Sequence, residues 1–460
     1  MFGPVAMGPG IEDEGPMMFG RLLALTFFFL LAALGRAAAP DGATSGEAQT
    51  EDLNIFRRDF LEADRSYSDA ARREAEHRLQ ILEAKAGSTE AAAFAVDLCQ
   101  IAALADNGHT TCKLPHADGA PVSFLPVGGA FYVITASPRN SDLLGSRLIA
   151  VDGHPAAAVG SALRSLHGGV AAWRDIEAMD ALARPDLLHA LGLARATGDA
   201  TYRFQAGDGH VIERKLAPEP QRKDWVKLLP KDRMPWPLQD QQRAFRWRDA
   251  PELDAIVVEI RRNLDDKSGR IGDFLAKVEA DRSRLGRKNL VLDMRFNTGG
   301  NFMLTRDFLT AWPARIGAQG RVFVLESPFT FSAGMVDVAY LKQAGGDRVT
   351  LIGDAPGDRL MFFADQRQVS LPHSGVTLQY ATQRYDLQDG CRTYGDCFVG
   401  IAQPGSATGT PPTTAAAIDQ GKGRKPLSVK TLDPDIAAPW SVDDLLKKAA
   451  IRGWPPSRRQ

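Results

Sequence analysis

The second half of the chain alternates buried-type strands with amphipathic helices, and this alternation is the strongest constraint on the fold. Apolar runs predict strands at 255–260, 290–294, 321–325 and 349–353, with helices at 271–285, 305–314 and 333–344 between them. A strand, a helix and a further strand in succession form a βαβ unit, whose strands lie parallel. We therefore expect an α/β core on a parallel sheet, beginning near residue 254.

Two parts of different pattern precede this core. Residues 53–104 carry apolar side chains at helical spacing with charges between them, so we expect helices there. Residues 122–216 hold short β-rich runs, one helix and a hairpin signal, as in a small mixed β/α module. Residues 217–250 are rich in proline, tryptophan and charge, and we interpret them as a connector.

The N-terminus resembles an export signal. Residues 22–34 form an apolar run of 13 residues, preceded by Arg21 and followed by small residues at 37–39. A membrane-spanning helix needs about 18 apolar residues, so the h-region of a signal peptide fits better. Acidic residues before this run indicate that the true start is Met17 or Met18. We expect an exported, periplasmic or secreted protein without a membrane span after cleavage; the alternative is an uncleaved short anchor.

The four cysteines favour disulfides over a metal site. An even number of cysteines in an exported chain suggests disulfide pairing, and four of them allow three connectivities. The local pairs Cys99–Cys112 and Cys391–Cys397 are the simplest choice. Neither pair has the C-x-x-C spacing of a zinc or thioredoxin-like redox motif.

The charge balance and the missing motifs exclude several functions. Among 460 residues, 55 are Lys or Arg and 56 are Asp or Glu, which gives a net charge of −1. A sequence-independent nucleic-acid binder would carry a basic excess, so we expect no nucleic-acid partner. The chain lacks an H-E-x-x-H motif, a P-loop, a G-x-G-x-x-G fingerprint and an EF-hand loop. We expect neither a metal nor a nucleotide cofactor.

Three short stretches can carry chemistry. Ser332 follows a strand and opens a helix, where backbone N–H groups favour the negative charge that a nucleophile and its oxyanion develop. Gly299 and Gly300 follow another buried strand and let the backbone approach a ligand. His109 lies in a turn after a helical stretch, where a general base can stand. Taken singly, these features are more often an N-cap serine, a tight turn and a surface histidine than parts of a site.

In combination the stretches resemble the tail-specific, or C-terminal processing, protease family, in the lysine-lacking branch that includes the tricorn core protease. Residues 106–110 (DNGHT) resemble its D-G-H-T/S histidine turn, and 292–300 (LDMRFNTGG) resemble its L-R-x-N-x-G-G strand and turn. Residues 330–333 (TFSA) resemble its T-x-S-A nucleophile turn, and 147–155 (RLIAVDGHP) its PDZ-like I-x-x-I-D-G-x-P stretch. The resemblance covers roughly residues 95–450, with later landmarks at 351–354, 371–375 and 434–436.

The resemblance implies a multidomain α/β fold with an N-terminal helical part, a PDZ-like β/α module and a βαβ-rich, ClpP/crotonase-like protease core. The expected segments are a signal peptide at 1–39, the helical region with the histidine at 40–115, the PDZ-like module at 116–220, and the core at 221–460 with an insertion near 398–430.

The same resemblance assigns roles to single residues. Ser332 would be the acyl nucleophile and His109 the general base. Gly299 or Gly300, together with Ala333, would offer oxyanion N–H groups. Sequence distance between base and nucleophile is no obstacle, because folds assemble such groups.

Two departures from the family pattern bear on the mechanism. The other branch of the family uses a lysine base in a G-K-G context, where this chain has Gly357, Asp358 and Arg359 at 357–359. This favours a serine–histidine mechanism or a loss of catalysis. The acid that orients the histidine has no clear match, since the family's glutamate position falls in the insertion. Asp386, Asp389 and Asp106 are the candidates.

The sequence thus predicts an exported serine-type endopeptidase that hydrolyses a peptide or an unfolded protein without a cofactor. One alternative is a catalytically inactive member of the fold that binds a peptide or an apolar ligand. Another is an esterase-like hydrolase that uses the same serine and histidine.

Overall fold

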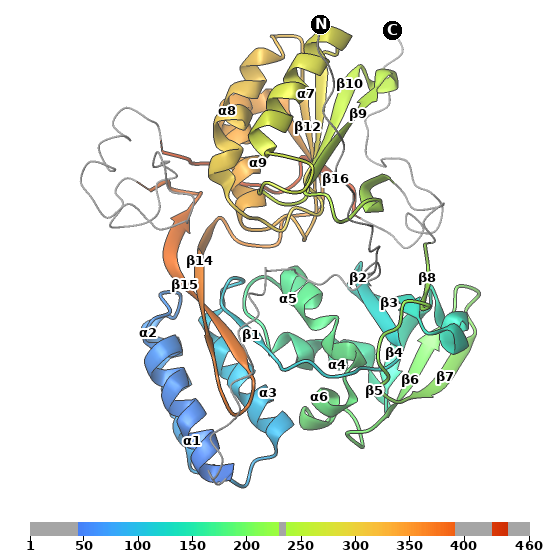
Figure 1. Cartoon of the computed structure of the whole chain (residues 1–460), viewed down its shortest axis with the longest axis vertical. Coiled ribbons are helices and arrows are strands. Elements are labelled where there is room, and N and C mark those ends of the chain that lie inside the picture. The colour runs from blue at the N-terminus through green and yellow to red at the C-terminus, as the bar shows by residue number, and fades with distance from the viewer. Residues whose placement is uncertain (1–44, 230–235, 392–425, 440–460) are drawn as a thin grey trace, which may run out of the picture.

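The computed structural model describes residues 45–229, 236–391 and 426–439. The predicted signal peptide, most of the predicted insertion and Cys397 lie outside these residues. Within them, no helix is long and apolar enough to cross a membrane. The expected mixed α/β, multidomain architecture is confirmed, and it divides into an upper core and a lower body in Figure 1.

The upper core is built on a six-stranded sheet in the order β16-β13-β12-β11-β10-β9. Its strands are β9 (Phe245–Ala250), β10 (Ala255–Ile260), β11 (Asn289–Asp293), β12 (Val322–Glu326), β13 (Val349–Gly353) and β16 (Ile436–Ala437). Neighbouring strands run parallel, except that β9 pairs antiparallel with β10. The interpretation of 217–250 as a connector is therefore wrong for β9, which is an edge strand. Its sequence mixes apolar and charged residues, so it did not show the apolar run of a buried strand.

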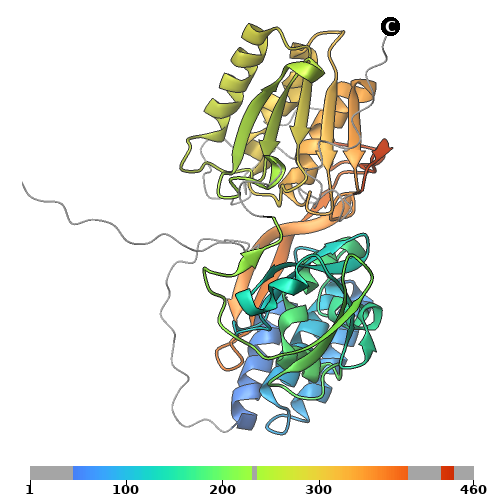
Figure 2. The ribbon, with the colours of Figure 1, turned by 90° about the vertical axis from the view of Figure 1, so that its right-hand side faces the viewer.

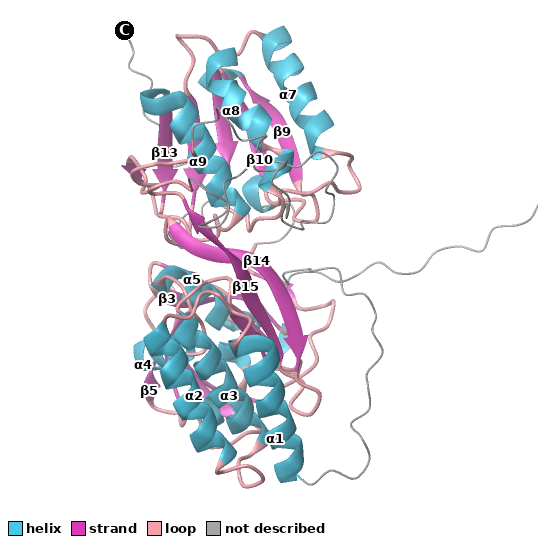
Figure 3. Ribbon diagram, turned by 90° about the vertical axis from the view of Figure 1, so that its left-hand side faces the viewer, coloured by secondary structure: helices cyan, strands magenta, loops and turns pink. Residues whose placement is uncertain are grey.

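Three helices cover one face of this sheet: α7 (Ile271–Leu285), α8 (Arg306–Arg315) and α9 (Ala333–Gly345) (Figure 3). Strands β10 to β13 are spatial neighbours in chain order, and crossovers between parallel strands share one hand, so each helix packs on the same side. Apolar residues of the helices and of alternate strand positions form the main core beneath them.

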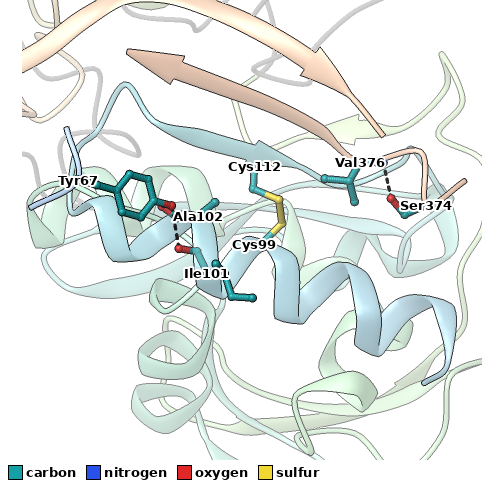
Figure 4. Close-up of a disulfide and its surroundings, with 7 residues drawn as sticks. All are labelled: Tyr67, Cys99, Ile101, Ala102, Cys112, Ser374 and Val376. Carbon is teal, nitrogen blue, oxygen red and sulfur yellow. Dashed lines mark hydrogen bonds between the residues drawn. A yellow bond between two sulfur atoms is a disulfide. The ribbon is translucent and has the colours of Figure 1, made fainter. Parts of the chain in front are cut away.

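The N-terminal helices form one side of the lower body. They are α1 (Ser45–Ile55), which continues as a π-helical turn (Phe56–Leu61), α2 (Asp69–Glu83) and α3 (Ala91–Ala102). The Cys99–Cys112 disulfide ties α3 to the chain that follows it, with 5.1 Å between the Cα atoms, which confirms that predicted pair (Figure 4). Cys391 is also disulfide-bonded.

The other side of the lower body is a mixed β/α module. Its main sheet has the order β2-β3-β4-β6-β7, with β5 and β8 pairing beside it. Its strands are β2 (Val122–Val127), β3 (Ala130–Ala136), β4 (Arg147–Val151), β5 (His154–Pro155), β6 (Ala200–Gln205), β7 (Val211–Leu216) and β8 (Val226–Lys227), and its helices are α4 (Ala156–Arg164), α5 (Ala171–Ala178) and α6 (Pro185–Ala190). Its identity as a PDZ-like module stays a prediction.

A long hairpin joins the two halves. Strands β14 (Met361–Ser370) and β15 (Thr377–Asp386) leave the core and run down beside the N-terminal helices (Figures 1 and 2). There β15 pairs antiparallel with β1 (Thr111–Lys113). This pairing fixes the segment that directly follows His109. Short 3₁₀ turns complete the structure at Ala103–Ala105, Pro138–Leu143, Ala181–Ala183, Trp236–Leu238, Pro251–Leu253, Phe302–Leu304 and Gly346–Arg348.

Candidate active site

Ser332 stands on a strained turn between β12 and α9. Its backbone has φ +55° and ψ −124°, a conformation that costs a non-glycine residue about 1–3 kcal/mol. The turn before it is tied to the neighbouring strand, because the Thr330 hydroxyl donates to the Met294 carbonyl at 2.9 Å and accepts from the Ser327 N–H at 3.0 Å. Within the described part of the chain, no hydrogen bond engages the Ser332 hydroxyl.

The glycine turn after β11 lies against this serine. A Cβ atom built on Gly299 would stand 2.8 Å from Ser332 Cβ and 3.1 Å from its hydroxyl oxygen, so only glycine fits there. The same atom would lie 3.3 Å from the Ala333 nitrogen. The structure thus brings together the two strand-end turns that the sequence singled out.

The backbone N–H groups of this turn differ in their availability. The Gly299 N–H donates to the Asn297 side chain at 2.9 Å, so it is already engaged. Among the backbone hydrogen bonds of the described residues, none uses the N–H of Gly300 or of Ala333. Ala333 is also the first residue of α9, where the helix dipole favours negative charge. Gly300 and Ala333 therefore remain candidate oxyanion donors, and Gly299 supplies close approach instead.

His109 is buried next to the serine turn. Its side chain is 0% exposed, and its ring stacks on that of Phe331, the residue before Ser332, with 4.3 Å between the centroids. The turn is held by Asn107, whose side chain donates to the Phe363 carbonyl and accepts from the Phe363 N–H, both at 3.1 Å. The pairing of β1 with β15 holds the chain on the C-terminal side of His109.

The carboxylate in contact with His109 is Asp358, which the sequence did not predict. Its Oδ2 lies 3.4 Å from His109 Nδ1, and both side chains are buried. Gly108 permits this approach, because a Cβ there would lie 2.9 Å from the Phe331 ring and 3.3 Å from the same Oδ2. The adjacent Arg359 donates to the Asp106 carbonyl and carboxylate, each at 2.8 Å, which holds the histidine turn against residues 357–359.

The expected acids lie elsewhere. Asp386 accepts hydrogen bonds from Arg384, from the Gln388 N–H and from the Asp389 N–H. Asp389 is exposed, and Asp106 pairs with Arg174 and Arg359. The geometry therefore replaces all three with Asp358 as the acid candidate. Only its place at the family's lysine position could have drawn attention to it.

A second carboxyl, Asp365, lies close enough to interact electrostatically with His109. Burial raises the pKa of Asp365, while a hydrogen bond from the Tyr385 hydroxyl at 3.0 Å and the nearby His109 act in the opposite direction. Asp365 has no direct ion pair with the imidazole among the described residues.

His109 occupies the middle of a column of five stacked rings. Trp173 of α5 stacks on Phe331 at 3.7 Å, Phe331 on His109 at 4.3 Å, His109 on Phe362 at 5.3 Å, and Phe362 on Tyr385 at 5.0 Å. Neither ring nitrogen of His109 has a hydrogen-bond partner within the described residues. The hydrogen bond from the Ser332 hydroxyl to the imidazole is thus not formed in this arrangement.

Comparisons with known proteins show which solved structures share this fold. No family model and no curated protein matches the chain. Mature CPAF in complex with lactacystin aligns over 87% of this chain and 96% of its own, with 14% identity and a TM-score of 0.54. Mature CPAF alone aligns over 87% of this chain and 95% of its own, with 14% identity and a TM-score of 0.53. The photosystem II D1 C-terminal processing protease aligns over 86% of this chain and 94% of its own, with 13% identity and a TM-score of 0.36. The resemblance to the tail-specific protease family is confirmed at the level of the fold.

Proposed function

We propose that this chain, which has the fold of the tail-specific proteases, is an exported serine-type endopeptidase acting on peptides or unfolded proteins. The observation that carries the proposal is the convergence of three segments. A strained serine at a helix N-terminus, a glycine turn with an unengaged N–H, and a buried histidine–carboxylate pair meet within one small volume. These are the parts that acyl transfer needs.

The proposed mechanism assigns one task to each part. The Ser332 hydroxyl oxygen attacks the scissile carbonyl carbon while its proton passes to His109 Nε2. The N–H groups of Gly300 and Ala333 stabilise the oxyanion. His109 then gives the proton to the leaving amine, and water hydrolyses the acyl-enzyme with His109 again as base.

In this proposal Asp358 orients the imidazole and stabilises the imidazolium, in place of Asp386 or Asp389. Its contact with Nδ1 leaves Nε2 for the serine. The serine–histidine hydrogen bond would form when substrate enters, as catalytic hydrogen bonds often tighten only in the substrate complex.

The test is labelling with a fluorophosphonate, which forms a covalent bond with activated serines. The expected result is modification of Ser332, identified by mass spectrometry, and loss of labelling in Ser332→Ala and His109→Ala. His373→Ala is the matched control, because His373 lies in the turn between β14 and β15, where it pairs with Glu51 of α1, and its loss should leave labelling unchanged. Cleavage of a peptide library by the wild type, and not by Ser332→Ala, would then separate a peptidase from an esterase.

A binding protein without catalysis is the second candidate. The buried imidazole favours it, since neither ring nitrogen has a hydrogen-bond partner within the described residues and a base without a hydrogen bond to the serine does not activate it. A folded wild type that takes no label, even with peptide present, would establish this alternative over the peptidase.

A further inference from the structure

A chain of buried polar side chains runs from α9 to the glycine turn. Asp337 accepts from the Thr305 hydroxyl at 2.6 Å and from Asn263 Nδ2 at 2.7 Å. Asn263 Oδ1 accepts from Asn297 Nδ2 at 2.8 Å, and Asn297 Oδ1 accepts from the Gly299 N–H. The four side chains, Asn263, Asn297, Thr305 and Asp337, are all 0% exposed.

Asn263 is the centre of this chain and also grips the turn through its backbone. Its N–H donates to the Gly299 carbonyl and its carbonyl accepts from the Asn301 N–H, both at 2.8 Å. The contact is so close that a Cβ on Gly300 would stand 2.5 Å from the Asn263 carbonyl oxygen. One residue therefore holds both flanks of Gly300.

We propose that Asn263 is a positioning residue, which keeps the 299–301 turn beside Ser332 so that the Gly300 N–H can meet the developing oxyanion. This inference rests on the proposed function. Asn263 contacts no reacting atom; it acts through Asn297 and through the backbone of the turn. Its value lies in preorganisation, because an oxyanion donor helps only when it is already in place.

The direction of the side-chain amides follows from Asp337. A carboxylate only accepts, so it turns Asn263 Nδ2 toward α9 and Oδ1 toward Asn297. Asn297 then directs its own oxygen to the Gly299 N–H. The pKa of Asp337 is raised to about 7, because the effect of burial exceeds the opposite effect of the hydrogen bonds from Thr305 and Asn263. In the neutral form the proton can point to Thr305, whose hydroxyl lies 3.0 Å from the Phe302 carbonyl, so Oδ2 still accepts from Asn263.

The test compares three variants by the rate constant of fluorophosphonate labelling and by the kcat and KM of a peptide substrate. Asn263→Leu keeps the volume and removes the amide. We expect a loss of roughly 10- to 100-fold in labelling and kcat with little change in KM, because the donor acts in the transition state. Asn140→Leu is the matched control, since Asn140 is an equally buried amide with two side-chain hydrogen bonds in the β/α module.

The exchange of Asn263→Asp with Asp337→Asn restores a donor opposite an acceptor between positions 263 and 337 and between 263 and 297. It loses only the bond that Asn263 Nδ2 donates to the Thr305 hydroxyl at 3.0 Å. The new amide at 337 donates to the new carboxylate at 263, which also accepts from Asn297 Nδ2. We expect this double variant to label within about tenfold of the wild type, a rescue that a merely space-filling role does not explain. Wild-type labelling in folded Asn263→Leu, or a folded double variant more than about a hundredfold slower than the wild type, would overturn the inference. If Asn263→Leu does not fold, the labelling rate of the double variant alone tests the inference.

Failure of the proposed function is recognised separately, because the wild type would then take no label. In that case hydrogen exchange of the backbone at 299–301 replaces labelling as the readout. Faster exchange in Asn263→Leu than in the double variant supports the positioning role, and equal exchange in the two refutes it.

Discussion

Replacement of Asp358 by asparagine tests the histidine–carboxylate pair. In the proposed transition state His109 carries a positive charge 3.4 Å from Asp358 Oδ2, and both side chains are buried. At an effective dielectric constant of about 20, two unit charges at this distance attract by about 5 kcal/mol. Asparagine keeps the shape and a dipole but loses the charge, so we expect a loss of about 3–5 kcal/mol of transition-state stabilisation. This corresponds to a decrease of roughly 10²- to 10⁴-fold in acylation rate.

The assay is stopped-flow acylation by an activated ester at saturating concentration, with folding checked by near-ultraviolet circular dichroism. Asp365→Asn is the matched control, because this carboxyl also lies near His109 but is bonded to Tyr385 and makes no ion pair with the ring. It should slow acylation much less than Asp358→Asn. The reasoning is refuted if folded Asp358→Asn acylates within roughly tenfold of the wild type while His109→Ala is inactive.

Three further predictions concern stability, measured by urea unfolding. Glu326 is fully buried, and both its carboxyl oxygens lack a hydrogen-bond partner among the described residues. Burial raises the pKa of Glu326 well above 4.5. The folded state therefore keeps a proton that the unfolded chain releases. Glu326→Met should therefore be more stable than the wild type, by a margin that grows as the pH rises above about 4.5, at up to about 1.4 kcal/mol per pH unit. A margin independent of pH would contradict this. Ser332→Gly should gain about 1 kcal/mol relative to Ser332→Ala, because glycine accepts the positive φ without strain; equal stability of the two variants would show that the turn is not strained. Replacing both Cys99 and Cys112 by serine should cost about 3 kcal/mol, as expected for a short disulfide loop, with the fold retained, whereas an unchanged unfolding midpoint would mean that β1 is held without the bond.

Much of the core was predictable because its signals are local. The apolar runs at β10 to β13 and the periodicity of α7 to α9 match the observed elements within a few residues. Ser332 and the glycine turn were also predictable, since each follows a buried strand and parallel strands end at a common edge.

The partners of these residues were not predictable from such signals. Asp358 reaches His109 only because the histidine turn is carried to the core by pairing of β1 with β15 and by the contact of Arg359 with Asp106. Asn263 lies in an irregular segment after β10, and its role depends on α9. Both are long-range contacts, which a single sequence does not show.

The pairing of β1 with β15 has a consequence for the order of synthesis. A ribosome produces the His109 turn early and the Ser332 turn much later, but the strand that holds the histidine in place, Thr377–Asp386, comes after both. In a growing chain, Ser332 is therefore present before the strand that holds the His109 turn in position. On the proposed mechanism, a molecule interrupted before residue 377 lacks the strand that pairs with β1, so the segment after His109 is not held and the base is not in position.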